Sequence, residues 1–211
     1  MGREVVNAPP PTLLEWGVAA RALPGERASG DLHLVETFTG GVLVAVVDAL
    51  GHGEDAAVAA RLAVATLAKY ASEPVDALVQ RCHQALRRRT RGVVMSLASF
   101  DATERTMTWL GVGNVEGFLY SADPEAQPRR ASLVTRGGIV GSELPVSRPW
   151  VIPVGAGDTL LFATDGVRTD FTDVFPPTGS TQHLADRLLE NNAKGTDDAL
   201  VLVARYVGPG R

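Results

Sequence analysis

The segment VLVAVVDALGHG, residues 42–53, carries the pattern from which the fold is inferred. Its first six residues are all apolar and mostly β-branched, so they predict a strand that is buried on both faces. The strand ends at Asp48, and a loop that contains two glycines follows. Upstream, residues 31–39 (DLHLVETFT) alternate roughly between polar and apolar side chains, and Gly40 and Gly41 separate the two segments. Because glycine supplies the positive φ of a tight turn, the two segments together predict a β-hairpin.

Two helices are expected after this hairpin. Residues 54–70 (EDAAVAARLAVATLAKY) are rich in alanine, begin with two acids and end near Lys69, which is the polarity that a helix dipole favours. Residues 74–89 (PVDALVQRCHQALRRR) begin with proline in the first turn and end in arginines, again the favoured polarity. The single cysteine, Cys82, falls inside the second helix, and we interpret it as a small packing residue.

The rest of the chain consists mainly of short apolar segments separated by turns. Strands in hairpin order with helices inserted between them predict an α+β layered domain rather than a βαβ Rossmann sheet. We expect one domain over residues 12–208, preceded by a proline-rich lead over residues 1–11, and a meander through residues 93–154. The expected strands are residues 13–22, 93–100, 106–112, 115–121, 131–135, 150–154, 159–163 and 199–207, with a late helix at residues 181–194.

Composition limits the possible functions. The chain has 211 residues, with 20 basic and 24 acidic side chains and a formal net charge of −4. This mild acidity, with an aromatic content of 6%, argues against nucleic acid as the main partner, because phosphate backbones require clustered positive charge. One cysteine excludes an intrachain disulfide framework, and the sequence shows neither a membrane-spanning segment nor a signal-peptide core. We therefore expect a cytoplasmic protein without membrane contact.

Aspartates recur where the expected strands begin or end. Asp31 opens one strand, Asp48 and Asp165 follow two others, and Asp197 and Asp198 precede the last. For any one of them the ordinary interpretation is a turn, because Asp beside Gly suits tight-turn geometry. As a set with few Lys or Arg neighbours, they favour a site for Mg²⁺ or Mn²⁺, which take oxygen ligands. Without a partner, a carboxylate at the end of a buried strand would be costly.

Six motifs of the chain stand in the order that is typical of a known family. Together they resemble the metal-dependent serine/threonine protein phosphatases of PPM type, specifically the bacterial SpoIIE-like branch and its small, stand-alone RsbX type. The resemblance extends from about Ser29 to the end of the chain. The motifs are SGD (29–31), VDALGHG (47–53), GVGNVEG (111–117), GGIVG (137–141), DTLLFATDG (158–166) and DDAL (197–200).

The resemblance implies a four-layer α-β-β-α sandwich, in which helices flank two antiparallel sheets, with two Mn²⁺ or Mg²⁺ ions at one edge. By motif matching, Asp48 would bridge both ions and the carbonyl of Ala49 would bind one of them. Asp165 and Asp197 would hold the other ion. Asp31 would lie beside the site, as a ligand or through metal-bound water, so catalysis is expected to involve Asp31 as well as Asp48.

Three positions leave alternatives open. The family usually has glycine after the bridging aspartate, where this chain has Ala49, although a backbone carbonyl can still coordinate. Asp198 is an alternative to Asp197 as a ligand, because the sequence does not separate the pair. His52 could protonate the leaving oxygen as a general acid, or it could be an exposed histidine in the loop beside the site.

Two further segments have a structural and a functional interpretation. The run RRRTR, residues 87–91, could bind an acidic or phosphorylated partner, but we favour the solvated C-terminus of a helix. Asn114 could line the site. The glycines around it, in residues 111–117, predict a tight turn between strands rather than a dinucleotide fingerprint.

The function that the resemblance implies is hydrolysis of phosphoserine or phosphothreonine on a regulatory protein, by water that two metal ions activate. The RsbX type suggests phosphorylated STAS-domain proteins of a stressosome as substrates. One alternative is a non-catalytic partner-binding module on the same fold, which the alanine at position 49 would suit. Another is a small-molecule phosphomonoesterase, which would require a deep pocket.

Overall fold

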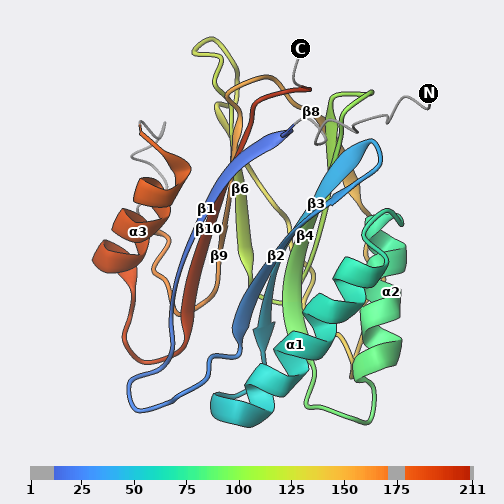
Figure 1. The fold of residues 1–211 in the computed structure, drawn as a ribbon, viewed down its shortest axis with the longest axis vertical. Helices are drawn as coiled ribbons and strands as arrows, with labels where there is room; N and C mark the ends of the chain where they lie inside the picture. Colours follow the sequence, from blue (N-terminus) through green and yellow to red (C-terminus); the bar gives the residue numbers. More distant parts are fainter. Residues whose placement is uncertain (1–11, 171–178, 210–211) are drawn as a thin grey trace, which may run out of the picture.

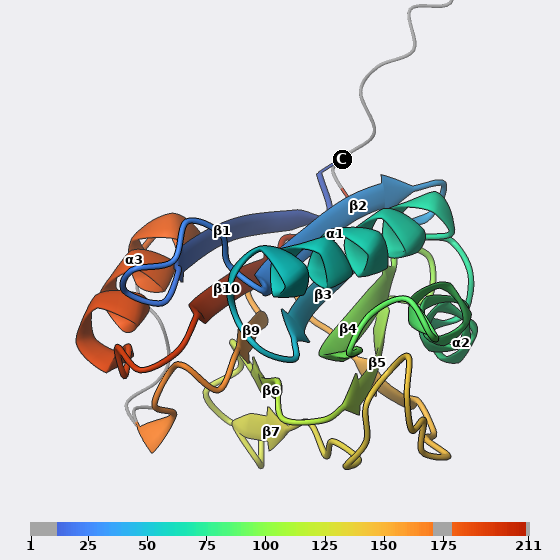
Figure 2. The same ribbon diagram turned by 90° about the horizontal axis from the view of Figure 1, so that it is seen from below.

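The structure, a computed structural model, describes residues 12–170 and 179–209. Two five-stranded sheets lie face to face, and helices cover both outer faces (Figures 1 and 2). The expected four-layer α-β-β-α sandwich is thereby confirmed. The proline-rich lead expected over residues 1–11 lies outside the described residues. Within the described ranges, no helix combines the length and the apolar character needed to cross a membrane.

The first sheet contains β2 (Asp31–Phe38), β3 (Gly41–Ala49), β4 (Val93–Asp101), β5 (Thr106–Val112) and β8 (Trp150–Pro153), in that order. Every neighbouring pair is antiparallel, and β2 and β3 form the expected hairpin, which turns at Gly40 with a φ of +89°. Leu43 and Val47 of β3 pack towards the helices, whereas Val44 and Val46 pack towards the other sheet. This confirms that β3 is buried on both faces.

The second sheet contains β1 (Leu14–Arg21), β10 (Ala199–Tyr206), β9 (Thr159–Ala163), β6 (Glu116–Tyr120) and β7 (Arg130–Ser132), in that order. The prediction of one meander through residues 93–154 is therefore wrong. After β5 the chain turns at Gly113, with a φ of +92°, and β6 joins the second sheet by pairing with β9. β8 then returns to the first sheet. Apolar patterning marks each strand, but long-range packing decides its partner.

Three helices of the described ranges cover the sheets. α1 (Gly53–Lys69) and α2 (Val75–Leu86) lie over the first sheet, and α3 (Thr181–Asn192) lies over the second (Figure 2). Cys82 of α2 is fully buried, and burial raises the pKa of its thiol to about 12, which agrees with a packing role. α2 ends earlier than the sequence predicted, and Arg88 has a φ of +61°, so the arginine run is a loop rather than the last helical turn.

Candidate metal centre

Strand ends from both sheets meet at one edge of the sandwich. In the β2–β3 hairpin, Asp31 and Asp48 lie directly opposite one another, because β2 begins where β3 ends. In the second sheet, β9 ends where β10 begins, which brings Asp165 close to Asp197 and Asp198. The antiparallel register of two separate strand pairs therefore gathers acidic residues that are far apart in the sequence.

Thr164 joins the two sheets at this edge. Its hydroxyl accepts a hydrogen bond from the backbone N–H of Leu200, at 2.8 Å, and donates to a carboxylate oxygen of Asp31, at 2.7 Å. Asp31 belongs to the first sheet, whereas Leu200 belongs to the second and Thr164 directly follows β9 of the second. Since both groups are buried, this bond holds the two sets of acids at a fixed separation.

A cavity of about 560 Å³, here called the carboxylate cavity, opens between the two sets of acids. Among the described residues that line it there is no lysine or arginine. Asp31 is not part of its lining and lies buried beside it. The lining residues are Asp48, Ala49, Leu50, Gly51, His52, Val94, Gly113, Asn114, Gly137, Ile139, Asp165 and Asp197.

The acids of the first sheet are poorly compensated within the described part of the chain. Burial, with additional repulsion from neighbouring carboxylates, raises the pKa of Asp48 from 3.8 to about 8. Burial raises the pKa of Asp31 to about 7, although the hydrogen bond from Thr164 opposes the shift. In the described ranges no hydrogen-bond donor reaches the carboxylate of Asp48. Among the described residues, these carboxyl groups thus gather without an ion pair to a side-chain cation, since Lys194 reaches only the backbone carbonyl of Asp165.

Asp198 and Asp197 have different environments. Asp198 is buried, and its two carboxylate oxygens accept hydrogen bonds from the backbone N–H groups of Leu23 and Gly30, both at 2.7 Å. Asp197 is exposed, lines the carboxylate cavity and accepts one hydrogen bond, from the N–H of Asp198. This geometry favours Asp197 as the ligand, because both oxygens of Asp198 already fasten the segment between β1 and β2.

Asp165 is also oriented by a neighbour. The side-chain amide of Asn114 donates to one of its carboxylate oxygens at 2.8 Å, and the ammonium of Lys194 donates to its backbone carbonyl at 2.6 Å. Asn114 lies in the turn between β5 and β6, so the chain's crossing between the sheets positions it. The second carboxylate oxygen of Asp165 accepts no hydrogen bond from the described residues and is available to a ligand.

His52 lies at the N-terminus of α1 and lines the carboxylate cavity. Its side chain is 57% exposed, and its Nδ1 lies 2.7 Å from a carboxylate oxygen of Glu26. Gly53, with a φ of +76°, makes room for this pair, because a Cβ there would lie 2.8 Å from the other oxygen of Glu26. With Nδ1 engaged, Nε2 is the ring nitrogen left for a substrate.

The donor chemistry of the cavity fits divalent metal ions. Carboxylate oxygens of Asp48, Asp165 and Asp197 line one cavity, and no described residue donates a hydrogen bond to the carboxylate of Asp48. A hard divalent cation would bind such oxygen ligands and compensate their charge. In the described ranges no three acidic, histidine or cysteine side chains already stand at the spacing of a formed metal site. The three aspartates instead surround open space, so ligands from water would complete the coordination.

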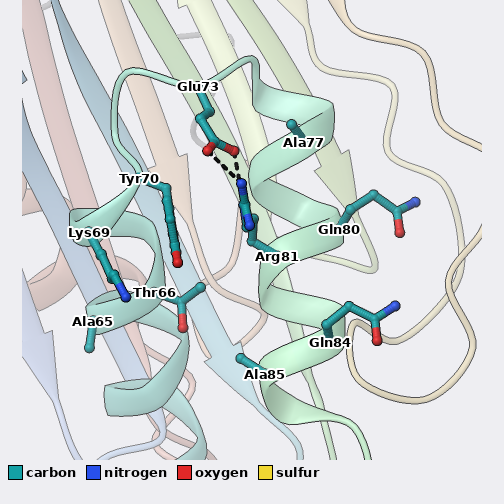
Figure 3. A pocket seen from close by; sticks show the side chains of 10 residues that line it. All are labelled: Ala65, Thr66, Lys69, Tyr70, Glu73, Ala77, Gln80, Arg81, Gln84 and Ala85. Atoms are coloured by element: carbon teal, nitrogen blue, oxygen red, sulfur yellow. Dashed lines mark hydrogen bonds and ion pairs between the residues drawn. The ribbon is translucent and has the colours of Figure 1, made fainter.

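A larger cavity of about 790 Å³ lies elsewhere, between α1 and α2. Figure 3 shows its lining, where Arg81 forms an ion pair with Glu73 and lies over the ring of Tyr70. No strand-end aspartate lines it. The predicted site residues other than Asp31 therefore line the smaller cavity and not the groove between the helices.

The chain also matches a known protein family. The model of the family described as Stage II sporulation protein E (SpoIIE) matches residues 39–207. The chain belongs to the SpoIIE family. This is an enzyme family of serine/threonine phosphatases, so the sequence resemblance is confirmed at the level of the family.

Individual SpoIIE-family relatives are similar over different lengths. Phosphoserine phosphatase RsbX of Bacillus subtilis (strain 168) is 30% identical over 102 residues, which are 48% of this chain, so the match spans about half, 51%, of that relative. A structure described as the bacterial stressosome, a modular system adapted to control secondary messenger signalling, has a TM-score of 0.83 at 30% identity. It covers 91% of this chain and 99% of its own.

A crystal structure of RsbX in complex with magnesium has the same fold, with a TM-score of 0.81 at 21% identity, covering 92% of this chain and 95% of its own.

Sequence reasoning missed two residues of the site. Glu26 lies in an irregular segment before β2, and nothing in its neighbourhood in the sequence indicates that it reaches His52. Thr164 stands in the motif that supplies Asp165, but its bond to Asp31 depends on the packing of two sheets. Asn114, which the sequence placed near the site, does line the cavity.

Proposed function

We propose that the chain is a metal-dependent phosphatase that removes phosphate from serine or threonine of a regulatory protein. The observation that carries this proposal is the convergence of Asp48, Asp165 and Asp197 on one cavity that has no lysine or arginine among its described lining residues. Membership of the SpoIIE family supplies the reaction class.

In this proposal the described residues hold two divalent ions, Mn²⁺ or Mg²⁺. Asp48, the backbone carbonyl of Ala49, Asp165 and Asp197 would hold them, because all four residues line the carboxylate cavity. When bound, the ions would supply a water of lowered pKa and positive charge facing the phosphoryl oxygens. Asp31 orients the site from beside it, through its hydrogen bond with Thr164. Alanine at position 49 contributes only a backbone carbonyl, so its methyl group leaves the ligand unchanged.

His52 is proposed to donate the proton that the leaving serine or threonine oxygen requires. Its Nε2 is left for the substrate, because Glu26 engages Nδ1. Glu26 thus acts as a positioning residue that fixes the ring beside the cavity. A positioned general acid contributes about 10² to 10⁴ in rate when the leaving group is a poor one.

The proposed substrate is a phosphorylated STAS-domain protein of a stressosome. Support comes from the similarity to phosphoserine phosphatase RsbX over about half of that protein, and from the stressosome structure that resembles the chain over most of its length. A cytoplasmic location is part of the same proposal.

The test is metal-dependent turnover. Protein stripped with EDTA and dialysed is assayed for phosphate release from a phosphoserine protein, before and after addition of Mn²⁺ or Mg²⁺, while calorimetry follows the binding of Mn²⁺. We expect turnover only with added metal. Activity that survives both EDTA and Asp48→Asn would contradict the mechanism. Metal binding without turnover of any phosphoester would instead favour a non-catalytic module.

A further inference from the structure

The arginine run at residues 87–91 forms a built surface rather than a frayed helix end. α2 ends at Leu86, and Arg88 holds a φ of +61°, a backbone conformation that residues other than glycine seldom adopt. This turn places the following arginines in the loop before β4 instead of in the last helical turn. The arginines that follow Arg88 therefore lie beyond the helix, in the loop that leads to β4.

These arginines border a recess of about 500 Å³, here called the arginine recess. Three of its lining residues are arginines and one is an acid. Within the described ranges, no carboxylate pairs with Arg88, Arg89 or Arg91, and all three side chains are exposed. The lining residues are Leu50, Asp55, Val58, Ala59, Arg88, Arg89, Thr90 and Arg91.

The arginine recess adjoins the carboxylate cavity. Leu50, two residues after Asp48, lines both. On the same loop, Gly51 lines the carboxylate cavity and lies against the guanidinium of Arg91, since a Cβ there would be 2.6 Å from Nη1. Gly51 also has a φ of +99°, which favours glycine, so both its backbone and its contact with Arg91 require a residue without a side chain. One loop thus separates a strongly acidic cavity from a strongly basic recess.

We propose that the arginine recess binds acidic residues that flank the phosphorylated serine or threonine of the protein substrate. This inference rests on the proposed function and narrows its substrate class. Guanidinium groups bind carboxylates through paired hydrogen bonds, and those of the recess carry no competing partner among the described residues. An extended peptide advances about 3.3 to 3.6 Å per residue, so a few residues carry it across the Leu50–Gly51 loop from one site to the other.

The charge pattern also selects against the opposite kind of substrate. The carboxylate cavity attracts cationic peptide and repels anionic peptide until metal is bound, whereas the recess does the reverse. A substrate with an acidic flank therefore gains its attraction only at the recess, which orients the phosphorylated residue towards the carboxylate cavity. Apolar contacts with Leu50 and with the half-exposed Val58 extend the same surface.

The test compares two phosphoserine peptides that differ only in the flank, one with Asp and Glu, the other with Asn and Gln. We expect the metal-loaded protein to have a kcat/KM about fivefold to tenfold higher for the acidic peptide, with a preference that falls as salt rises, the scale of a few exposed charge pairs. The double variant Arg88→Asn/Arg89→Ser should lose the preference and keep its turnover of p-nitrophenyl phosphate. The control is Arg129→Ser/Arg187→Ser, which removes two exposed arginines elsewhere and should keep the preference.

Fluorescence anisotropy of the same labelled peptides separates this inference from the proposed function. Absence of turnover on every phosphoester would refute the phosphatase, while tighter binding of the acidic peptide that depends on Arg88 and Arg89 would still support the recess. Equal binding of both peptides, or a preference that the double variant retains, would overturn the recess. Tighter binding of a single-stranded oligonucleotide than of the acidic peptide would also overturn it.

Discussion

Asp48, at the end of β3 in the first sheet, and Asp198, directly before β10 of the second, lie at the same edge of the sandwich. Their carboxylates differ in the hydrogen bonds that they accept. Asp198 is 3% exposed and receives two backbone N–H groups at 2.7 Å, so its charge is satisfied by the chain. Asp48 lines the carboxylate cavity, receives no donor from the described residues and has its pKa raised to about 8 by burial and by neighbouring acids.

The difference separates two uses of a strand-end aspartate. A carboxylate that accepts two N–H groups holds a loop in place and has no free oxygen for another ligand. A carboxylate left among other acids destabilises the metal-free protein and is retained where an external cation compensates it. In the sequence, both residues are simply aspartates beside the end of an expected strand, so the sequence does not separate the two roles.

The largest expected effect comes from Asp48→Asn. Loss of the proposed bridging ligand should lower turnover of a phosphoserine protein by about 10³-fold, measured as initial rates with saturating Mn²⁺. Because the change removes a largely buried acid whose carboxylate no described donor contacts, the free energy of unfolding of the metal-free variant in urea should not fall. A variant that keeps a tenth of the activity would contradict the proposed difference between Asp48 as a metal ligand and Asp198 as a structural residue.

His52→Gln tests the proposed general acid, which lines the same cavity as Asp48. Turnover of a phosphoserine peptide should fall about 10²-fold, because the leaving serine oxygen needs a proton. Turnover of p-nitrophenyl phosphate should change much less, since nitrophenolate leaves without one. Glu26→Gln should give a smaller loss in the same direction. Equal losses on both substrates would assign His52 to binding instead of proton donation.

Asp197→Asn and Asp198→Asn form a matched pair of adjacent substitutions. Asp197→Asn should weaken the binding of Mn²⁺, measured by calorimetry, by about tenfold to a hundredfold with little change in stability. Asp198→Asn should lower the free energy of unfolding by about 2 kcal/mol, because an amide nitrogen would face a backbone N–H. The reverse result would exchange the roles of the two residues.

The metal-free protein should also show a pH-dependent stability. Asp31 and Asp48 titrate near 3.8 when unfolded, but their pKa values in the folded protein are about 7 and about 8. Between these limits the folded state binds more protons, so the free energy of unfolding should fall as the pH rises from about 4 to about 8. The slope is at most about 1.4 kcal/mol per pH unit for each group.

Denaturant titrations at several pH values measure this slope. Saturating Mn²⁺ should flatten it, and Asp48→Asn should remove its part of it. A metal-free protein whose stability rises across the same pH range would contradict the raised pKa values of Asp31 and Asp48. It would also contradict the proposed difference between Asp48 and Asp198.

Local pattern was sufficient for most elements of the fold. The β2–β3 hairpin follows from the apolar run after Gly40 and Gly41, and the helix over residues 54–70 differs from α1 by one residue at each end. The end of α2 was placed too late, because arginine has good helix propensity and the left-handed backbone at Arg88 leaves no mark in the sequence. The prediction of one meander over residues 93–154 is wrong, because apolar patterning indicates that a segment forms a strand but not with which strand it pairs.

The sequence by itself determined which residues form strands, that aspartates stand at the ends of those strands, and to which family their order belongs. Only the tertiary structure decided that Asp197 lines the carboxylate cavity while Asp198 is hydrogen-bonded to the backbone, that Glu26 reaches His52, and that the arginine recess adjoins the carboxylate cavity. The physical reason is that strand formation depends on neighbours in the chain, whereas the state of a charged group depends on every donor and charge within a few ångströms of it. Those partners come from distant segments, so folding must bring them together before their effect exists.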